Sequence, residues 1–227
     1  MILLPSALSK IQNGLVVSCQ APQESPLRPH NLMSIMAEAA QAGGAAGIRA
    51  EGLADIKKIK VSVSLPVIGL IKRKSEKTPI VITPDIQDVV DLLEAGADII
   101  ALDATLRNRD NGDSSFEFIK KAIDLGAIVL ADVDCVEAAI SAEKAGAHAV
   151  ATTLSGYTTD SKEIEPDLDL VRECANNCSV PVIAEGRYYT PDSMNFAFEN
   201  GAWAVCIGGA ITDPWTTTKR FVTLKSK

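Results

Sequence analysis

The sequence predicts a (β/α)8 TIM barrel built from residues 1–227 as one domain, and three observations support this fold. Eight short apolar runs recur along the chain, segments with helical periodicity lie between them, and every run ends in one polar residue or a glycine. Continuous runs rich in valine and isoleucine are typical of parallel strands that are covered on both faces. The length of 227 residues is slightly under the usual value of about 250 for this barrel.

The expected strands end at positions that collect polar side chains. These strands are residues 15–20, 47–49, 67–72, 99–103, 128–132, 149–152, 182–185 and 204–208. Their last residues are Gln20, Arg49, Lys72, Asp103, Asp132, Thr152, Glu185 and Gly208. In such a barrel the C-terminal ends of the strands meet at one mouth, where the active site lies. Side chains of both charge signs at that mouth indicate a small polar substrate.

Glycines and prolines mark where the intervening helices end and begin. Five glycines follow a segment of helical periodicity and precede a strand, as is typical of the residue after a helix: Gly44, Gly96, Gly126, Gly146 and Gly201. Three pairs predict an N-cap residue followed by proline at the first helical position: Thr83-Pro84, Thr190-Pro191 and Asp213-Pro214. The alternative fold is a doubly wound open sheet. It is weakened because no G-x-G-x-x-G motif opens a helix after the first strand.

Composition argues against several classes of protein. A net charge of −7 gives no global electrostatic support for nucleic-acid binding. The longest apolar runs have strand length and the N-terminus lacks signal-peptide features, so neither a membrane span nor secretion is expected. An odd number of cysteines, five, favours a reduced cytoplasmic protein. Cys174 and Cys178 share a helix face without a histidine or a second cysteine pair, so no metal is expected. A homodimer is left open.

The loops after the last two strands predict a barrel of the phosphate-binding type. They begin Glu185-Gly186-Arg187 and Gly208-Gly209-Ala210-Ile211-Thr212. Glycines let backbone N–H groups approach phosphate oxygens, and the following helix N-terminus adds positive potential. The residues expected to bind phosphate are Gly186, Arg187, Gly208 and Gly209. The alternative for Gly208 and Gly209 is a simple tight turn.

Lys72 and Glu185 are the candidate catalytic residues. Lys72 could be an acid/base whose pKa is lowered by burial or by Arg49, or it could form a Schiff base as in class I aldolases. A structural ion pair is the non-catalytic alternative. Glu185 could be a second acid/base or an orienting carboxylate.

The other polar strand ends have binding roles or structural ones. Asp103 and Asp132 could bind substrate hydroxyls or anchor loops by hydrogen bonds. Arg49 could bind an anion or a carbonyl, or form a salt bridge with Asp103 or Glu51. His148 opens the sixth expected strand at the non-catalytic end, so a structural role is expected.

Seven motifs together resemble one enzyme family. They are Ser18-Cys19-Gln20, Gly47-Ile48-Arg49, Val67-Ile68-Gly69-Leu70-Ile71-Lys72-Arg73, Ala101-Leu102-Asp103-Ala104-Thr105, Thr152-Thr153-Leu154-Ser155-Gly156-Tyr157-Thr158, Ile183-Ala184-Glu185-Gly186-Arg187 and Gly208-Gly209-Ala210-Ile211-Thr212. They resemble those of N-acetylmannosamine-6-phosphate 2-epimerase from about residue 14 onward. The resemblance implies a cofactor-independent conversion of N-acetylmannosamine 6-phosphate to N-acetylglucosamine 6-phosphate in sialic-acid and amino-sugar catabolism.

The resemblance also implies roles for individual residues. Lys72 matches the acid/base at C2 and Glu185 matches an assisting glutamate. Gln20, Arg49 and Asp132 match positions around the sugar. Asp103, Thr152 and Tyr157, which lie in the matching motifs, are also predicted to bind substrate.

One position departs from the family pattern, and three other functions stay open. Where the family usually has a phosphate-binding arginine, this chain has Asp213, which could instead cap the helix that begins at Pro214. Arg187, Lys219 or Arg220 could compensate. A Schiff-base aldolase, another phosphosugar isomerase or decarboxylase, and a non-catalytic phosphosugar sensor are the alternatives. No function is assigned to the charged segment 106–115.

Overall fold

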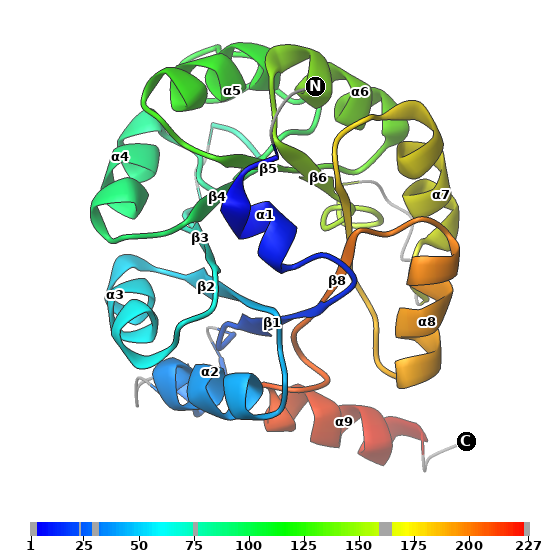
Figure 1. The fold of residues 1–227 in the computed structure, drawn as a ribbon. Coiled ribbons are helices and arrows are strands. Elements are labelled where there is room, and N and C mark those ends of the chain that lie inside the picture. The colour runs from blue at the N-terminus through cyan, green and yellow to red at the C-terminus, as the bar shows by residue number, and fades with distance from the viewer. Residues whose placement is uncertain (1–3, 23, 29–31, 75–76, 159–164, 225–227) are drawn as a thin grey trace.

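The computed structural model describes residues 4–22, 24–28, 32–74, 77–158 and 165–224, and its centre is a closed parallel barrel (Figure 1). The strands are β1 (Leu15–Cys19), β2 (Gly47–Glu51), β3 (Val67–Leu70), β4 (Ile99–Asp103), β5 (Val129–Asp132), β6 (Ala149–Ala151), β7 (Val182–Glu185) and β8 (Ala204–Ile207). They follow chain order around the barrel, and β8 closes onto β1. The predicted (β/α)8 fold is therefore confirmed.

Helices alternate with the strands and surround the barrel (Figure 1). They are α1 (Ser6–Lys10), α2 (Met33–Ala42), α3 (Leu53–Ser62), α4 (Ile86–Glu94), α5 (Ser115–Asp124), α6 (Val136–Ala145), α7 (Leu168–Asn177), α8 (Pro191–Glu199) and α9 (Pro214–Leu224). Within the described ranges, no helix combines the length and the apolar character that crossing a membrane requires.

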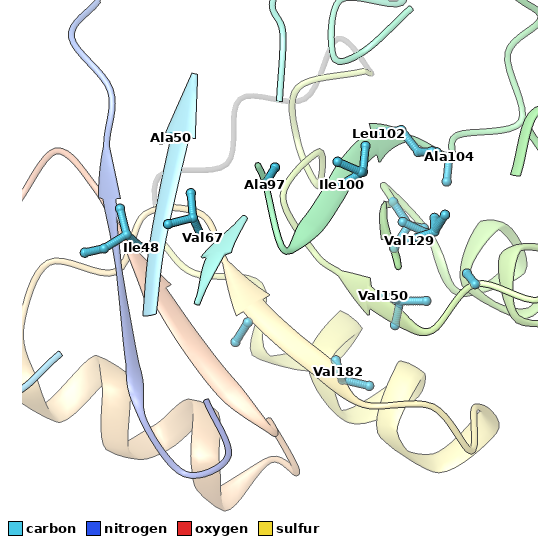
Figure 2. Packing of buried hydrophobic residues seen from close by; sticks show 14 of the residues in the cluster. Ile48, Ala50, Val67, Ala97, Ile100, Leu102, Ala104, Val129, Val150 and Val182 are labelled. Carbon is cyan, nitrogen blue, oxygen red and sulfur yellow. The ribbon is translucent and has the colours of Figure 1, made fainter. Parts of the chain in front are cut away.

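Alternation along each strand divides the core into two apolar layers. Successive side chains of a strand point to opposite faces. Ile48, Ala50 and Val150 point outward and pack beneath the helices (Figure 2), whereas Ile68 and Leu130 fill the barrel interior. This period of two decides which residue at each strand end reaches the mouth.

The N-terminal end of the barrel is closed by α1, which the sequence did not predict. In Figure 1, α1 lies across the ring of strands. Leu8 and Ile11 are fully buried in the inner layer, and each such side chain contributes about 1.5–3 kcal/mol when buried. The indole N–H of Trp203 donates to the Leu8 carbonyl at 2.9 Å. The helix therefore seals the end of the barrel opposite the mouth.

Two of the three predicted N-caps are confirmed, and the third is wrong. Thr190 caps α8 with Pro191 in the first turn, and the Asp213 carboxylate accepts from the Thr216 amide at the start of α9. Helix α4, however, is capped by Asp85 rather than Thr83. The Thr83 hydroxyl instead donates to the Ala101 carbonyl of β4 at 2.6 Å.

The strand that was expected to end at Lys72 leaves the barrel at Leu70. Residues 71–73 then pair antiparallel with residues 81–83, and Lys72 lies opposite Ile82. The Ile82 carbonyl also accepts from the Asp103 amide at 3.0 Å. This short ribbon, inserted between the ends of β3 and β4, holds the backbone of Lys72 above the barrel.

His148 gives the fold a predicted pH dependence. Its Nδ1 accepts from the Val129 amide at 3.1 Å, which requires an unprotonated Nδ1, and burial lowers its pKa below the ordinary 6.5. Below pH 6.5 the unfolded chain takes up a proton that the folded chain resists, so stability should fall as the pH drops through the lowered pKa. Urea unfolding from pH 7.5 to 5.5 measures this effect. The free energy of unfolding should depend less steeply on pH in His148→Leu than in the wild type. Parallel curves would contradict this.

Candidate active site

The mouth of the barrel holds a buried ion pair between β2 and β5. Arg49 and Asp132 are 1% and 0% exposed, and they face each other across the interior. Nη1 of Arg49 donates to Oδ1 of Asp132 at 3.1 Å, and Nη2 donates to Oδ2 at 2.5 Å. Two parallel charge-assisted bonds fix the planes of the guanidinium and the carboxylate relative to each other. The expected alternative partners of Arg49, Asp103 and Glu51, are not the ones it takes.

Glu185 on β7 lies against the other side of the same guanidinium. Its Oε2 is 3.1 Å from Arg49 Nη1, but the alignment is not that of a hydrogen bond. Burial alone would lower the pKa of Arg49, but Asp132 and Glu185 raise it well above its usual range. Arg49 is therefore a permanent cation. The Glu185 oxygen keeps free hydrogen-bonding capacity toward the mouth.

The electrostatics at Glu185 suit proton transfer. Burial raises the pKa of Glu185, and the neighbouring Asp132 raises it further, while Arg49 opposes both effects. The Cys206 thiol lies beside Glu185 in the register of β7 and β8, and its interaction with this carboxyl, like that of Arg49, lowers the pKa of Glu185. A carboxyl with a raised pKa can carry a proton closer to neutrality than an ordinary glutamate.

The Lys72 amine faces the same group of charges. Desolvation lowers the pKa of Lys72 and Arg49 lowers it further, against the opposing fields of Glu185, Glu51 and Asp132. This is the shift expected for an acid/base. The side chain is nevertheless exposed at the open mouth, so water limits the shift until a ligand displaces it. The structure thus brings together Lys72, Arg49, Asp132 and Glu185 from four different strands or strand ends.

Asp103, predicted to bind substrate, is committed to the loop that follows β4. Its Oδ1 accepts from the amide and the hydroxyl of Thr105 at 3.0 and 2.7 Å, and Oδ2 accepts from Arg107 Nη2 at 2.8 Å. Arg109, stacked 3.6 Å over the Phe118 ring, donates to the Asp103 carbonyl at 2.9 Å. These bonds favour the loop-anchor interpretation. They also give the segment 106–115 a structural role that the sequence did not reveal.

Thr152, predicted to bind substrate, and its neighbour Thr153 use their hydroxyls on different parts of the site. Thr152 follows the outward side of Val150, and its hydroxyl bonds the backbone of Glu185, donating to the carbonyl at 3.0 Å and accepting from the amide at 3.1 Å. Thr153 follows the inward side of Ala151, and its hydroxyl donates to Asp132 at 2.7 Å. The period of two along a strand could have distinguished the two threonines.

Gln20 and the loop after β8 offer unused hydrogen-bonding groups. The Gln20 amide donates to the Ser18 hydroxyl at 2.9 Å, and its Oε1 is buried without a partner in the described part of the chain. The Gly208 carbonyl accepts from the amides of Ile211 and Thr212, which makes the loop a tight turn. Among the described residues the Gly209 amide has no acceptor, and a side chain placed there would meet nothing within 4 Å. The turn therefore presents an open backbone N–H.

Arg187 and Tyr157 lie outside this group of charges. Arg187 donates to the carbonyls of Glu165 and Ser155 at 2.7 and 2.8 Å, and it lies 5.5 Å over the Tyr157 ring. The Tyr157 side chain is 65% exposed. Arg187 thus anchors the loop after β6. Neither residue, as placed here, points its polar group at Lys72.

No group of three or more metal-ligating side chains occurs in the described ranges. Cys174 is buried and Cys178 is partly buried, both as free thiols. Burial raises the pKa of Cys174 to about 12 and that of Cys178 to about 11. These thiols are therefore protonated packing groups rather than ready thiolate ligands.

Comparison with known proteins identifies the family. The family model described as "Putative N-acetylmannosamine-6-phosphate epimerase" matches residues 33–227. The chain belongs to this family. A relative of the same description from Caldanaerobacter subterraneus subsp. tengcongensis is 47% identical over 95% of this chain and 92% of its own. One from Clostridium perfringens is 43% identical over 94% of this chain and 97% of its own.

Solved structures give the same result. The N-acetylmannosamine-6-phosphate 2-epimerase from Clostridium perfringens superposes with a TM-score of 0.92 at 42% identity, covering 96% of this chain and 95% of that one. Thiamine phosphate pyrophosphorylase from Pyrococcus furiosus reaches a TM-score of 0.62 at 18% identity, a likeness of fold alone. The resemblance drawn from the motifs is therefore confirmed.

Within the family fold, Asp213 has a structural task. It is 3% exposed, and its carboxylate accepts from the Thr216 amide at 3.1 Å and from the Thr216 hydroxyl at 2.5 Å. The first of these contacts satisfies one of the free backbone donors at the start of α9. The helix-cap interpretation of this departure from the family pattern is thus the one that the contacts support.

Replacing Asp213 should cost stability and leave substrate binding unchanged. Asp213→Ala should lower the free energy of unfolding by about 0.5–2 kcal/mol, the usual cost of losing an N-cap. The KM for N-acetylmannosamine 6-phosphate should stay within about two-fold, because the carboxylate is turned into the helix. Chemical denaturation and steady-state kinetics measure the two effects. Unchanged stability with an altered KM would assign Asp213 to the ligand instead.

Proposed function

We propose that the chain is an epimerase that interconverts N-acetylmannosamine 6-phosphate and N-acetylglucosamine 6-phosphate by removing and returning the C2 proton. The observation that carries this proposal is the group of charges at the mouth, in which the fixed cation Arg49 and the buried carboxyl Glu185 both act on Lys72. Family membership supports the substrate, and the four-residue group supports the chemistry.

Lys72 suits the role of the base at C2. The open-chain sugar has an aldehyde at C1 and an acetamido group at C2, so loss of the C2 proton gives an enolate whose charge rests largely on the C1 oxygen. A lowered pKa increases the fraction of neutral amine that can accept this proton. Return of the proton to the opposite face completes the inversion. No electron leaves or enters the sugar in this sequence.

Arg49 suits the role of the group that stabilises the enolate oxygen. It is held rigidly by Asp132, it is permanently charged, and it lies in a water-poor interior. A preorganised cation of this kind stabilises developing charge without having to reorient during the reaction. Glu185, whose pKa is raised, suits proton transfer to and from the ring oxygen when the ring opens.

The loops after β7 and β8 suit the phosphate. The open N–H of Gly209 and the space around it support a phosphate site at the loop after β8. Gly186, with φ of 117°, is in a conformation that favours glycine. Of the predicted phosphate ligands, Arg187 needs a change of partners to take part. Remote phosphate binding would fix C2 against Lys72.

The alternatives share parts of this site. A Schiff-base aldolase would use the same lysine as a nucleophile, and borohydride trapping with substrate distinguishes it. A sensor would bind the phosphosugar without turnover. The homodimer, the cytoplasmic location and the absence of nucleic-acid partners stay predictions.

A proton NMR assay in D₂O tests the proposed function. Wild-type protein with N-acetylmannosamine 6-phosphate should form the 2-epimer, with deuterium entering C2 as the Lys72 amine exchanges with solvent. Added chelator should change nothing, and the unphosphorylated sugar should be a poor substrate, because the phosphate contributes to positioning. Strict dependence on added NAD, or equal kcat/KM for the two sugars, would contradict the mechanism or the phosphate site respectively.

Lys72→Ala should abolish turnover without unfolding the protein. Loss of a general acid/base costs about 10²–10⁴ in rate, and more when one group serves both faces. Lys57→Ala, on the exposed side of α3, is the matched control and should be fully active. Near wild-type activity of Lys72→Ala would remove this lysine from the chemistry.

Glu185→Gln should lower kcat far more than it weakens binding. The amide keeps the shape of the side chain but cannot carry the proton, and a role in proton transfer is felt mainly in the transition state. Steady-state kinetics with both epimers measure the effect. A variant with normal kcat and a raised KM would show that Glu185 only binds the sugar.

A further inference from the structure

The two threonines that follow β6 contact the two acidic residues beside Arg49: Thr152 bonds the backbone of Glu185, and Thr153 bonds the carboxylate of Asp132. Thr152 lies on the outer side of the wall. Thr153, on the inner side, donates its hydroxyl to Oδ1 of Asp132 at 2.7 Å. The same oxygen accepts from Arg49 Nη1 at 3.1 Å. Thr153, Asp132 and Arg49 therefore form one hydrogen-bonded chain that crosses the barrel mouth from β6 to β2.

We infer that Thr153 is a positioning residue: its hydroxyl fixes the carboxylate of Asp132 and, through the ion pair, the guanidinium of Arg49. The inference rests on the proposed function for its kinetic consequences, but the geometry that carries it is independent of the substrate. Among the described residues, Arg49 and Thr153 are the side chains that hydrogen-bond the Asp132 carboxylate.

The torsion that needs fixing is a soft one. Rotation of an aspartate carboxylate about its last bond is broad rather than confined to narrow wells. The Arg49 pair alone could turn as a unit, because a bidentate pair fixes its two planes relative to each other and not relative to the barrel. The bond from Thr153 ties that unit to the backbone of β6. The hydroxyl thus fixes the orientation of the ion pair relative to the barrel.

Misplacing Arg49 would affect the reacting end of the sugar. The charged groups that face Lys72 are Arg49 and Glu51 from β2, Asp132 from β5 and Glu185 from β7. The Thr153 hydroxyl dipole offsets part of the Asp132 charge. Without it, the stronger field of Asp132 should stabilise the charged amine and move the Lys72-dependent limb of the pH profile upward.

Two substitutions at one position separate positioning from packing. Thr153→Val keeps the shape and removes the hydroxyl, whereas Thr153→Ser keeps the hydroxyl. Thr153→Val should lower kcat by about ten- to a hundred-fold, the cost of a small misplacement near the reacting atoms, with KM within about three-fold. Thr153→Ser should recover kcat to within about three-fold of the wild type. Thr223→Val, on the exposed surface of α9, controls for the change of side chain and should be unaffected.

A second background tests whether Thr153 acts through Asp132. Once Asp132→Asn has weakened the ion pair, adding Thr153→Val should cost little more, because the two residues act as one unit. Equal losses from Thr153→Val in both backgrounds would overturn the inference. A kcat of Thr153→Val within about three-fold of the wild type would overturn it as well.

Crystal structures of the wild type and Thr153→Val test the inference independently of any activity measurement. The variant should show the Asp132 carboxylate rotated and the Arg49 guanidinium displaced with it. An unchanged bidentate pair would overturn the inference even if activity fell. If the wild type failed to epimerise the sugar, the proposed function would fail, and the crystallographic comparison would still decide the role of Thr153.

Discussion

The buried ion pair of Arg49 and Asp132 is the interaction on which the active end of the barrel depends. Two charges that are almost fully withdrawn from water are expensive unless each is fully paired, and removing one partner of such a pair typically costs about 3–5 kcal/mol. Here the pairing joins β2 to β5, and a third contact adds Glu185 from β7. These paired charges of both signs keep the mouth of the barrel polar.

The same cation acts on two titrating groups in opposite surroundings. Arg49 lowers the pKa of Lys72, whereas burial and Asp132 raise that of Glu185 despite Arg49. Both shifts move the group toward the pH range in which it can exchange protons in either direction. Pairs of titratable groups displaced in this way are a recurring mark of acid–base sites. The fixed charge of Arg49 thus adds to the shift at Lys72 and limits the shift at Glu185.

The sequence revealed the barrel because its strands are continuous apolar runs with a polar residue at each end, and the central residues of the site are those ends. It could not show what depends on distant contacts. The helix α1 looks like an unremarkable short segment until Trp203, far along the chain, bonds it. The cap at Asp85 rather than Thr83 depends on a ribbon inserted beside β4. The sequence predicts that Asp103 binds substrate, but it does not show that the Asp103 carboxylate accepts a hydrogen bond from Arg107.

Thr152 and Thr153 show a finer limit. Their residue types are the same and they are adjacent, so composition cannot separate them. The alternation of Ala149, Val150 and Ala151 separates the two threonines only when it is continued past the end of the strand. The predicted phosphate loops are at the expected place. Whether Arg187 joins them depends on the Glu165 and Ser155 carbonyls, which no local pattern identifies.

Closure of one end of the barrel by α1 determines how substrate and product enter and leave. Since Leu8 and Ile11 fill the far end of the barrel, both epimers must enter and leave through the mouth at the C-terminal ends of the strands. A newly formed product blocks the arrival of the next sugar until it departs, and either epimer can be loaded from solution. Like any catalyst, the protein does not change the equilibrium between the two sugars. Net conversion follows the concentrations of the two sugars outside, and whichever reaction removes one of them decides which way the balance moves.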